Sequence, residues 1–200
     1  HLDRLGLELD VINKGYAELL TSDPVPETSK EPFTEDEITR LWAIQGEPWV
    51  DSVLIFLYSG WRISELLGLK CADVDLDAGT MKGGVKTKAG KGRIVPIHSK
   101  IAEIVKRRYN EGGEYLLSYE NGKQVSTSQY YILWNAVMKR IGAEHTVHET
   151  RHTFRSKLDS AGANKSAIDK IMGHSGGGTG EKVYTHKTIQ ELKDAIELID

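Results

Sequence analysis

Six side chains along the sequence have the types needed for chemistry on an anionic phosphodiester. They are two arginines, a lysine, two histidines and a tyrosine: Arg62, Lys88, His148, Arg151, His174 and Tyr184. Arginine is permanently charged and binds phosphate oxygens through a two-pronged fork of N–H groups. A tyrosine hydroxyl can act as a nucleophile. This inventory predicts a site that binds a phosphodiester and attacks it with a side chain.

A zinc site is a second interpretation of one of these stretches. Residues 148–152 match the H-E-x-x-H pattern, in which two histidines on one helix face bind zinc and the glutamate acts as a base. His174 would be the third ligand. However, Arg151 would place a permanent cation within one turn of the metal, and the loop-like residues before His148 put this histidine at the start of the helix. We therefore do not favour a zinc hydrolase.

The charge of the chain is unevenly distributed. The formal net charge is −3, which alone argues mildly against a nucleic-acid partner. Residues 1–50, however, hold eleven acidic and four basic side chains, whereas residues 82–108 hold nine basic side chains and one acidic one, Glu103. A solvated basic hairpin and helix face would explain the second stretch, and so would a site for an anionic ligand.

The elements that must position these residues are predicted to be mostly helices. A capping box at 34–37 and helical apolar spacing predict helices from 34 onward and over 48–58, 62–69, 99–110, 126–141, 149–161, 164–172 and 189–199. Alternation and turn residues predict strands around 74–76, 85–88 and 93–97, with Pro96 at a sheet edge. The expected fold class is mainly α with a small three-stranded antiparallel β-sheet (α+β).

A domain boundary is predicted near residue 32. Residues 1–22 read as a helical piece, and residues 22–32 hold three of the five prolines together with Ser, Thr and Glu, which is typical of a linker. We expect 1–32 to be the tail of an upstream domain plus this linker, and 33–200 to be one domain. The single cysteine, Cys71, excludes internal disulfides and fits a reducing cytoplasm. The longest apolar run, 53–58, is too short to span a membrane.

Five motifs together resemble the catalytic domain of the tyrosine recombinase (phage integrase) family, and most of all the integrases of conjugative transposons. They are Gly-Trp-Arg-Ile-Ser-Glu-Leu at 60–66, Lys-Thr-Lys-Ala-Gly-Lys at 86–91, His-Glu-Thr-Arg-His-Thr-Phe at 148–154, Met-Gly-His-Ser at 172–175 and Tyr-Thr-His at 184–186. Each motif is modest alone, but their order and spacing are specific. The resemblance covers about residues 33–200, which makes this stretch the expected catalytic domain.

The resemblance implies site-specific DNA recombination through a covalent 3′-phosphotyrosine, without metal, cofactor or ATP. Tyr184 would attack the scissile phosphate and release a 5′-hydroxyl, while Arg62 and Arg151 would neutralise charge on the non-bridging oxygens. Lys88 would be the general acid for the departing oxygen, with Lys86 and Lys91 as rivals for this role.

The resemblance also assigns the remaining site residues. His148 would be the general base or orienter for Tyr184, and His174 would donate a hydrogen bond to the phosphate. Glu65 would orient Arg62 from three residues further along the helix, and a salt bridge at this spacing is also what helix geometry alone predicts. His152 and His186 are expected to be structural or to support the catalytic residues without touching the substrate.

The implied partners are double-stranded DNA and further copies of the protein in a synaptic complex. Side chains expected at the DNA backbone are Lys86, Lys91, Arg93, Arg155 and Lys157. The C-terminal helix 189–199 would dock on a neighbouring copy or, alternatively, on its own domain. The expected location is the cytoplasm of a bacterium, on the nucleoid. A type IB topoisomerase-like enzyme and a catalytically silent DNA-binding module remain alternatives.

Overall fold

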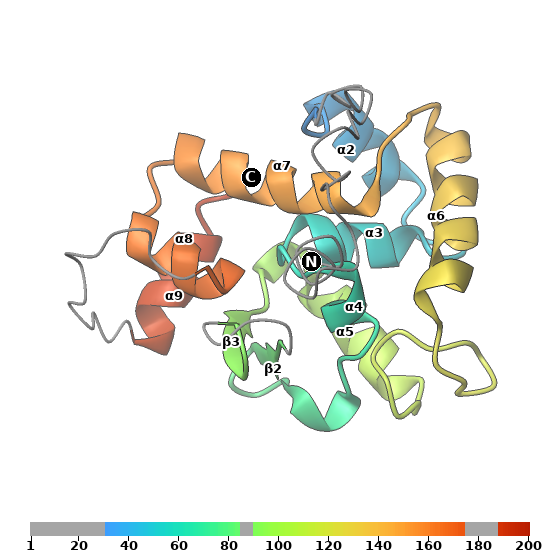
Figure 1. Ribbon diagram of the computed structural model, residues 1–200, viewed down its shortest axis with the longest axis horizontal. Coiled ribbons are helices and arrows are strands. Elements are labelled where there is room, and N and C mark those ends of the chain that lie inside the picture. Colours follow the sequence, from blue (N-terminus) through green and yellow to red (C-terminus); the bar gives the residue numbers. More distant parts are fainter. Residues whose placement is uncertain (1–30, 85–89, 175–187) are drawn as a thin grey trace, which may run out of the picture.

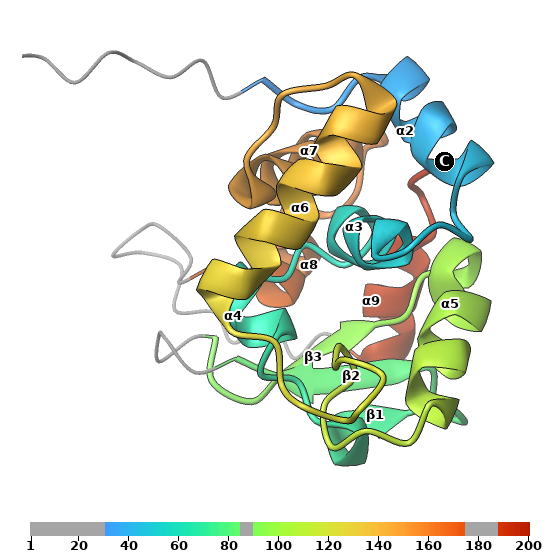
Figure 2. The ribbon, with the colours of Figure 1, turned by 90° about the vertical axis from the view of Figure 1, so that its right-hand side faces the viewer.

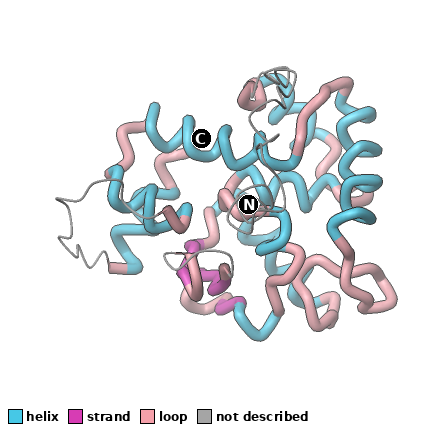
Figure 3. Tube along the Cα trace, in the orientation of Figure 1, coloured by secondary structure: helices cyan, strands magenta, loops and turns pink. Residues whose placement is uncertain are grey.

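The computed structural model describes residues 31–84, 90–174 and 188–200. This part of the chain is mostly helical, with one small sheet (Figures 1 and 3). The helices are α2 (Glu35–Ala43), α3 (Val50–Leu57), α4 (Ile63–Leu66), α5 (Ser99–Asn110), α6 (Thr127–Ile141), α7 (Val147–Ser160), α8 (Lys165–Met172) and α9 (Ile189–Ile196). The predicted fold class is confirmed. No helix in these described ranges is long and apolar enough to cross a membrane.

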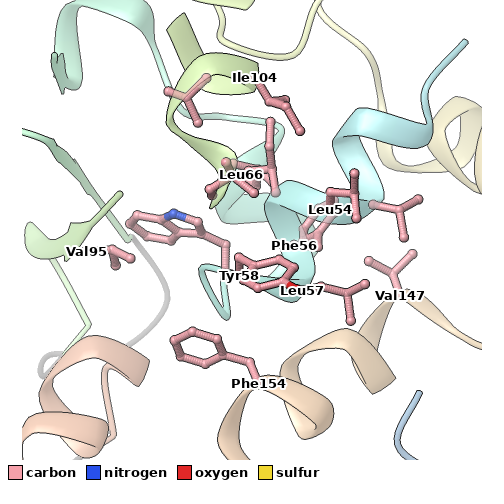
Figure 4. Close-up of a cluster of buried hydrophobic side chains, with 14 of the residues drawn as sticks. Leu54, Phe56, Leu57, Tyr58, Leu66, Val95, Ile104, Val147 and Phe154 are labelled. Carbon is pink, nitrogen blue, oxygen red and sulfur yellow. The ribbon is translucent and has the colours of Figure 1, made fainter. Parts of the chain in front are cut away.

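Helix α3 is the centre of the hydrophobic core. It contains most of the longest apolar run of the sequence, and all of its residues are buried. Helices α2, α5 and α7 pack against it. Figure 4 shows Ile104 of α5, Val95 of the sheet and Phe154 of α7 around the side chains of α3. Because Arg62 follows shortly after α3 and Arg151 lies on α7, the same core fixes both arginines.

The sheet contains three short antiparallel strands, β1 (Val74–Asp75), β2 (Thr80–Gly83) and β3 (Arg93–Pro96), in the order β1-β2-β3. Strand β3 is therefore an edge strand, as Pro96 predicts. The position of the second strand was predicted wrongly, because the strand that pairs with β3 is residues 80–83 and not 85–88. Residues 85–89 lie outside the described residues. The register pairs Gly83, the last residue of β2, with Arg93, the first residue of β3.

Most helix ends lie where local chemistry predicts them. Thr34 and Ser126 cap α2 and α6, and in each case the side chain three residues later bonds back to the cap. Gly142 and Gly173 end α6 and α8 with φ of 64° and 65°. Glycine adopts this left-handed conformation without the steric penalty that other residues incur.

The helix predicted over 189–199 ends at Ile196, and two further predicted helices have different limits. Helix α4 is a single turn and does not extend to Leu69, because the backbone of Leu69 and Cys71 bonds to Leu116 and Glu114 instead. Helix α3 begins after Trp49, whose φ of 67° is outside the helical region, so Pro48 precedes the helix.

Helix α9 packs on its own domain in this single chain (Figure 1). It contacts α8 and β3, and its buried side chains are Leu192, Ala195 and Ile196, followed by Ile199 beyond the helix end. Glu197 accepts hydrogen bonds from the backbone N–H and the hydroxyl of Ser99, at 2.7 and 2.6 Å. The structure thus has the C-terminal helix on its own domain, and docking on a neighbouring copy remains a prediction.

His98 also ties the C-terminus to α5. Its Nδ1 accepts from the backbone N–H of Lys100 at 3.0 Å and caps α5. A neutral imidazole then carries its proton on Nε2, which donates to the carbonyl of Ile199 at 2.9 Å. Burial lowers the pKa of His98 below its usual value of 6.5, and the nearby Glu197 opposes this shift in part. The fold therefore favours neutral His98.

The His98→Asn variant tests this contact, because asparagine can keep the cap but cannot reach Ile199. It should unfold with about 1 kcal/mol less free energy at pH 7.5, the net value of one hydrogen bond. Since the folded pKa of His98 is lowered, the unfolded chain binds more protons at mildly acidic pH. The contribution of His98 to the free energy of unfolding of the wild type is then complete above about pH 6.5 and decreases below that pH. Urea unfolding at pH 7.5 and 5.5 should show a smaller acid-induced loss in the variant; equal losses would contradict the assignment.

Candidate active site

Glu65 holds Arg62 at the start of α4. Its carboxylate accepts hydrogen bonds from the backbone N–H and the Nη1 of Arg62, both at 3.1 Å. The Glu65 side chain is fully buried, whereas that of Arg62 is 22% exposed. The predicted contact between these residues is therefore present. Part of the Arg62 side chain stays accessible to a ligand.

Arg151 reaches from α7 to two other segments. Its side chain is buried, and its two terminal nitrogens donate to the carbonyls of Gly60 and Met172. Nη2 also contacts Nε2 of His174 at 2.9 Å. Gly60 has a φ of 64°, and a Cβ there would lie 2.4 Å from Cδ1 of Phe154. Glycine is therefore required at position 60, where the chain passes α7. Through its contacts with Gly60, Met172 and His174, Arg151 joins three of the sequence motifs.

The site carries more positive than negative charge. Burial and the neighbouring Arg62 and Arg93 lower the pKa of Arg151 to about 9, so it stays charged at neutral pH. Within the described residues, Glu65 pairs with Arg62 and Arg93, Asp169 lies 3.7 Å from Nδ1 of His174, and Asp159 lies 3.5 Å from Arg155, so four arginines face three carboxylates. Charge repulsion among buried cations is relieved when an anion binds between them. A phosphodiester is such an anion.

His174 follows α8 and is neutral in this arrangement. Burial, then Arg151 and Arg155, lower its pKa below 6.5, and Asp169 opposes them. Because guanidinium groups only donate, Nε2 of His174 accepts from Arg151 at 2.9 Å. The Nδ1 atom then carries the proton, so its longer 3.3 Å contact with Arg155 is not a hydrogen bond. Donation from Nε2 to a phosphate requires the other tautomer or a second proton.

The prediction that Arg93 contacts the DNA backbone is wrong, because its side chain is only 2% exposed. Nη1 and Nη2 donate to the two oxygens of Glu65, at 3.0 and 2.7 Å, and Nε donates to the carbonyl of Ile171 at 2.9 Å. Each nitrogen of the guanidinium therefore donates a hydrogen bond within the protein and not to a DNA surface.

The stretch around His148 does not fit a zinc site. His148 is the second residue of α7, as predicted, and its ring centroid is 4.7 Å from that of His152. Glu149, the base that zinc chemistry would need, is buried and accepts from the backbone N–H of Thr146 at 2.7 Å. It also contacts Nδ1 of His145 at 3.0 Å. Over the described ranges, no three His, Cys, Asp or Glu side chains form a group that could hold a metal ion.

The other expected DNA contacts have different surroundings. Arg155 lies beside His174 and pairs with Asp159 at 3.5 Å, so it is in the site, and Lys91 is exposed. Lys157 pairs with the exposed Glu35 at 2.6 Å, and its contact with DNA stays a prediction. Four predicted residues lie outside the described residues: Lys86, Lys88, Tyr184 and His186.

The sequence analysis did not predict that the side chains of Arg93 and His145 are buried against partners. Arg93 is two residues before the fully buried Val95, and alternate strand residues share a face, so this pattern could have placed Arg93 inward. His145 contacts Glu37 at 3.1 Å and stacks on Phe33 with 3.9 Å between the ring centroids. Its partners are remote in sequence, and no local pattern predicts them.

Known proteins resemble this chain in sequence and in fold. The model of the phage integrase family matches residues 32–191. A tyrosine recombinase XerA of Thermococcus kodakarensis is 34% identical over 90% of this chain and 67% of its own length. A tyrosine recombinase XerC of Thermodesulfovibrio yellowstonii is 32% identical over 73% of this chain and 51% of its own length. The chain thus spans about two-thirds or less of the length of these relatives.

A solved structure of the Tn1549 transposon integrase, in complex with circular intermediate DNA, matches with a TM-score of 0.68. It is 25% identical, over 97% of this chain and 74% of that one. The family match covers most of the sequence and includes the segments that carry Arg62, Arg151 and His174. The chain belongs to the phage integrase family.

Proposed function

We propose that this chain is the catalytic domain of a site-specific DNA recombinase that cuts and rejoins strands through a 3′-phosphotyrosine. The observation that carries the proposal is the convergence of Arg62, Arg151 and His174 at one positively charged site. The likeness to tyrosine recombinases and to an integrase solved with DNA supports DNA as the substrate. The location that goes with this substrate is the bacterial nucleoid.

In the proposed reaction, the phenolic oxygen of Tyr184 attacks the scissile phosphorus, and its proton passes to His148. The bond to the 5′-oxygen breaks, and that oxygen leaves with a proton from Lys88. Arg62 and Arg151 stabilise the charge on the non-bridging oxygens, which is the kind of preorganised contact that contributes most to catalysis. The new bond between phosphorus and the tyrosine oxygen replaces the broken phosphoester bond. A 5′-hydroxyl from another strand can therefore reverse the step without ATP.

A nicked suicide duplex tests the proposal. Cleavage near a nick releases a short 5′-hydroxyl fragment that diffuses away, so the covalent intermediate accumulates. We expect a denaturant-resistant protein–DNA adduct that mass spectrometry maps to the peptide containing Tyr184. Binding without cleavage would favour the silent module. A type IB topoisomerase would form the adduct but would relax supercoiled DNA and not exchange strands between sites, so a strand-exchange assay separates the two enzymes.

We also propose that α9 docks on a neighbouring copy in the assembled complex. Its apolar face fills a site formed by α8 and β3, and every copy carries the same site, so exchange between copies would preserve the contacts. Strand exchange needs a hydroxyl from a second cleaved strand, which requires more than one protomer.

Deletion of residues 188–200 should abolish cooperative assembly on paired DNA sites in a gel-shift assay and retain binding of one copy to one site. The control is Glu197→Gln, which keeps α9 and weakens the contacts of this side chain with Ser99 and His98. This variant should still assemble. Cooperative assembly by the truncated protein would show that α9 has no role between copies.

A further inference from the structure

The feature that goes beyond the proposed roles is the buried environment of Arg93. Its guanidinium lies over the ring of Trp61, 4.1 Å from the centroid, and forms a two-pronged pair with Glu65. This is the strongest geometry available to an arginine and a carboxylate, and a lysine cannot reproduce it. Arg93 is therefore built to hold Glu65 in one orientation.

Glu65 needs this support because α4 is too short to be stable by itself. It is a four-residue turn, and isolated turns do not repay the cost of nucleation. The carboxylate of Glu65 is also fully buried, and a buried charge needs a partner. Arg62 is partly exposed and supplies one pair of hydrogen bonds, whereas the buried Arg93 supplies the other. The orientation of Arg62 thus depends on Glu65, and that of Glu65 depends on Arg93.

Arg93 also supports the turn before His174. Its Nε donates to the carbonyl of Ile171 in the last turn of α8. At Gly173, which ends the helix, an added Cβ would lie 3.0 Å from Cδ of Arg93. The chain reaches His174 immediately after this contact. One side chain therefore touches the supports of both Arg62 and His174.

We propose that Arg93 is a positioning residue for the recombination reaction: through Glu65 it orients Arg62 toward the scissile phosphate, and through α8 it places His174. This inference rests on the proposed function. Arg93 itself does not touch the substrate, because its side chain is only 2% exposed and each of its three guanidinium nitrogens donates to a group within the protein.

The test uses Arg93→Lys, which keeps the positive charge and loses the fork. Single-turnover cleavage is measured on two suicide duplexes, one with an ordinary scissile phosphate and one with a neutral methylphosphonate. Arg62 has no charge to neutralise on the second substrate, so the Arg62→Ala defect should be much smaller there. If Arg93 acts through Arg62, Arg93→Lys should show the same pattern. We expect roughly a 100-fold loss on phosphate, the size that small misplacement causes, and less than about tenfold on methylphosphonate.

Arg108→Lys is the matched control. Arg108 forms a two-pronged pair with the buried Asp51, at 2.7 Å for both bonds, and lies 5.0 Å from the ring centroid of Trp49. Its side chain is 11% exposed, and it lies on α5, across the molecule from α4 in Figure 2. This variant should lose similar thermal stability and retain the wild-type rate ratio between the two substrates.

The possible results separate the inference from the proposed function. No adduct with wild-type protein would refute the proposed function. A wild-type adduct combined with an equal loss on both substrates in Arg93→Lys, or with no loss, would refute the positioning role. If Arg93→Lys fails to fold, Arg93→Gln is measured in the same way, because the amide can donate to Glu65 but lacks the two-pronged fork. A loss on phosphate alone supports the inference in either variant.

Discussion

The Tyr184→Phe variant is expected to form no covalent adduct while it binds DNA as well as the wild type. Removal of a catalytic nucleophile costs on the order of 10⁴–10⁶ in rate, so the adduct should fall below detection. Phenylalanine differs from tyrosine only by the missing hydroxyl, so the substitution removes the proposed nucleophile and leaves the rest of the side chain in place. The measurement is adduct yield on the nicked duplex, with binding followed separately by gel shift.

The reason to select Tyr184 is its chemistry and its reach. A free tyrosine has a pKa near 10 and is protonated at neutral pH, so it requires a base such as His148. Tyr184 is ten residues from His174, and ten residues can span up to about 35 Å. A chain of this length can therefore carry the hydroxyl to a phosphate at the site proposed for Arg62 and Arg151.

A matched control excludes a general effect of losing a tyrosine hydroxyl. Tyr131 lies on α6 and is 43% exposed, and Tyr131→Phe should form the adduct at the wild-type rate. An adduct that persists in Tyr184→Phe, and that maps to another residue, would transfer the nucleophile's role to that residue. Loss of DNA binding in Tyr184→Phe would instead give this tyrosine a part in binding.

The parts of the fold that depend on neighbouring residues were predictable. Capping residues such as Thr34 and Ser126, and terminal glycines such as Gly142 and Gly173, act through hydrogen bonds and dihedral angles within a few residues. The pair of Arg62 and Glu65 was predictable for the same reason, since three residues on a helix bring side chains together.

The parts that depend on remote partners were not predictable. Strand alternation with Val95 can place Arg93 inward, but its partner Glu65 lies 28 residues away, and no local pattern predicts that pairing. Lys157 similarly pairs with Glu35, 122 residues away. A basic side chain can bind a ligand or pair with a carboxylate of the same chain, buried like Glu65 or exposed like Glu35, and tertiary packing determines which. The roles of individual cations therefore need the fold.

The Arg151→Ala variant is expected to lower the rate of adduct formation by about 10²–10³, the effect of removing one preorganised donor to a developing oxyanion. Arg151→Lys should recover little, because an ammonium group cannot contact Gly60, Met172 and a phosphate oxygen in one plane. The measurement is the single-turnover rate on the nicked duplex at saturating protein, so that weaker binding does not contribute.

Stability and activity should separate in Arg151→Ala. Two carbonyls lose a donor, each worth about 1 kcal/mol, but a cation with a lowered pKa leaves the repulsive field of Arg62 and Arg93. These effects oppose each other, so the melting temperature should change far less than the rate. Sulfate, a phosphate-like anion, should raise the melting temperature of the wild type more than that of the variant.

Arg140→Ala is the control. Arg140 lies exposed on α6 and donates to the carbonyl of Pro48 at 3.0 Å. Its loss should change neither the rate of adduct formation nor the response of the melting temperature to sulfate. If Arg151→Ala cleaves at the wild-type rate, the buried arginine serves packing, and the charge at the phosphate must come from Arg62.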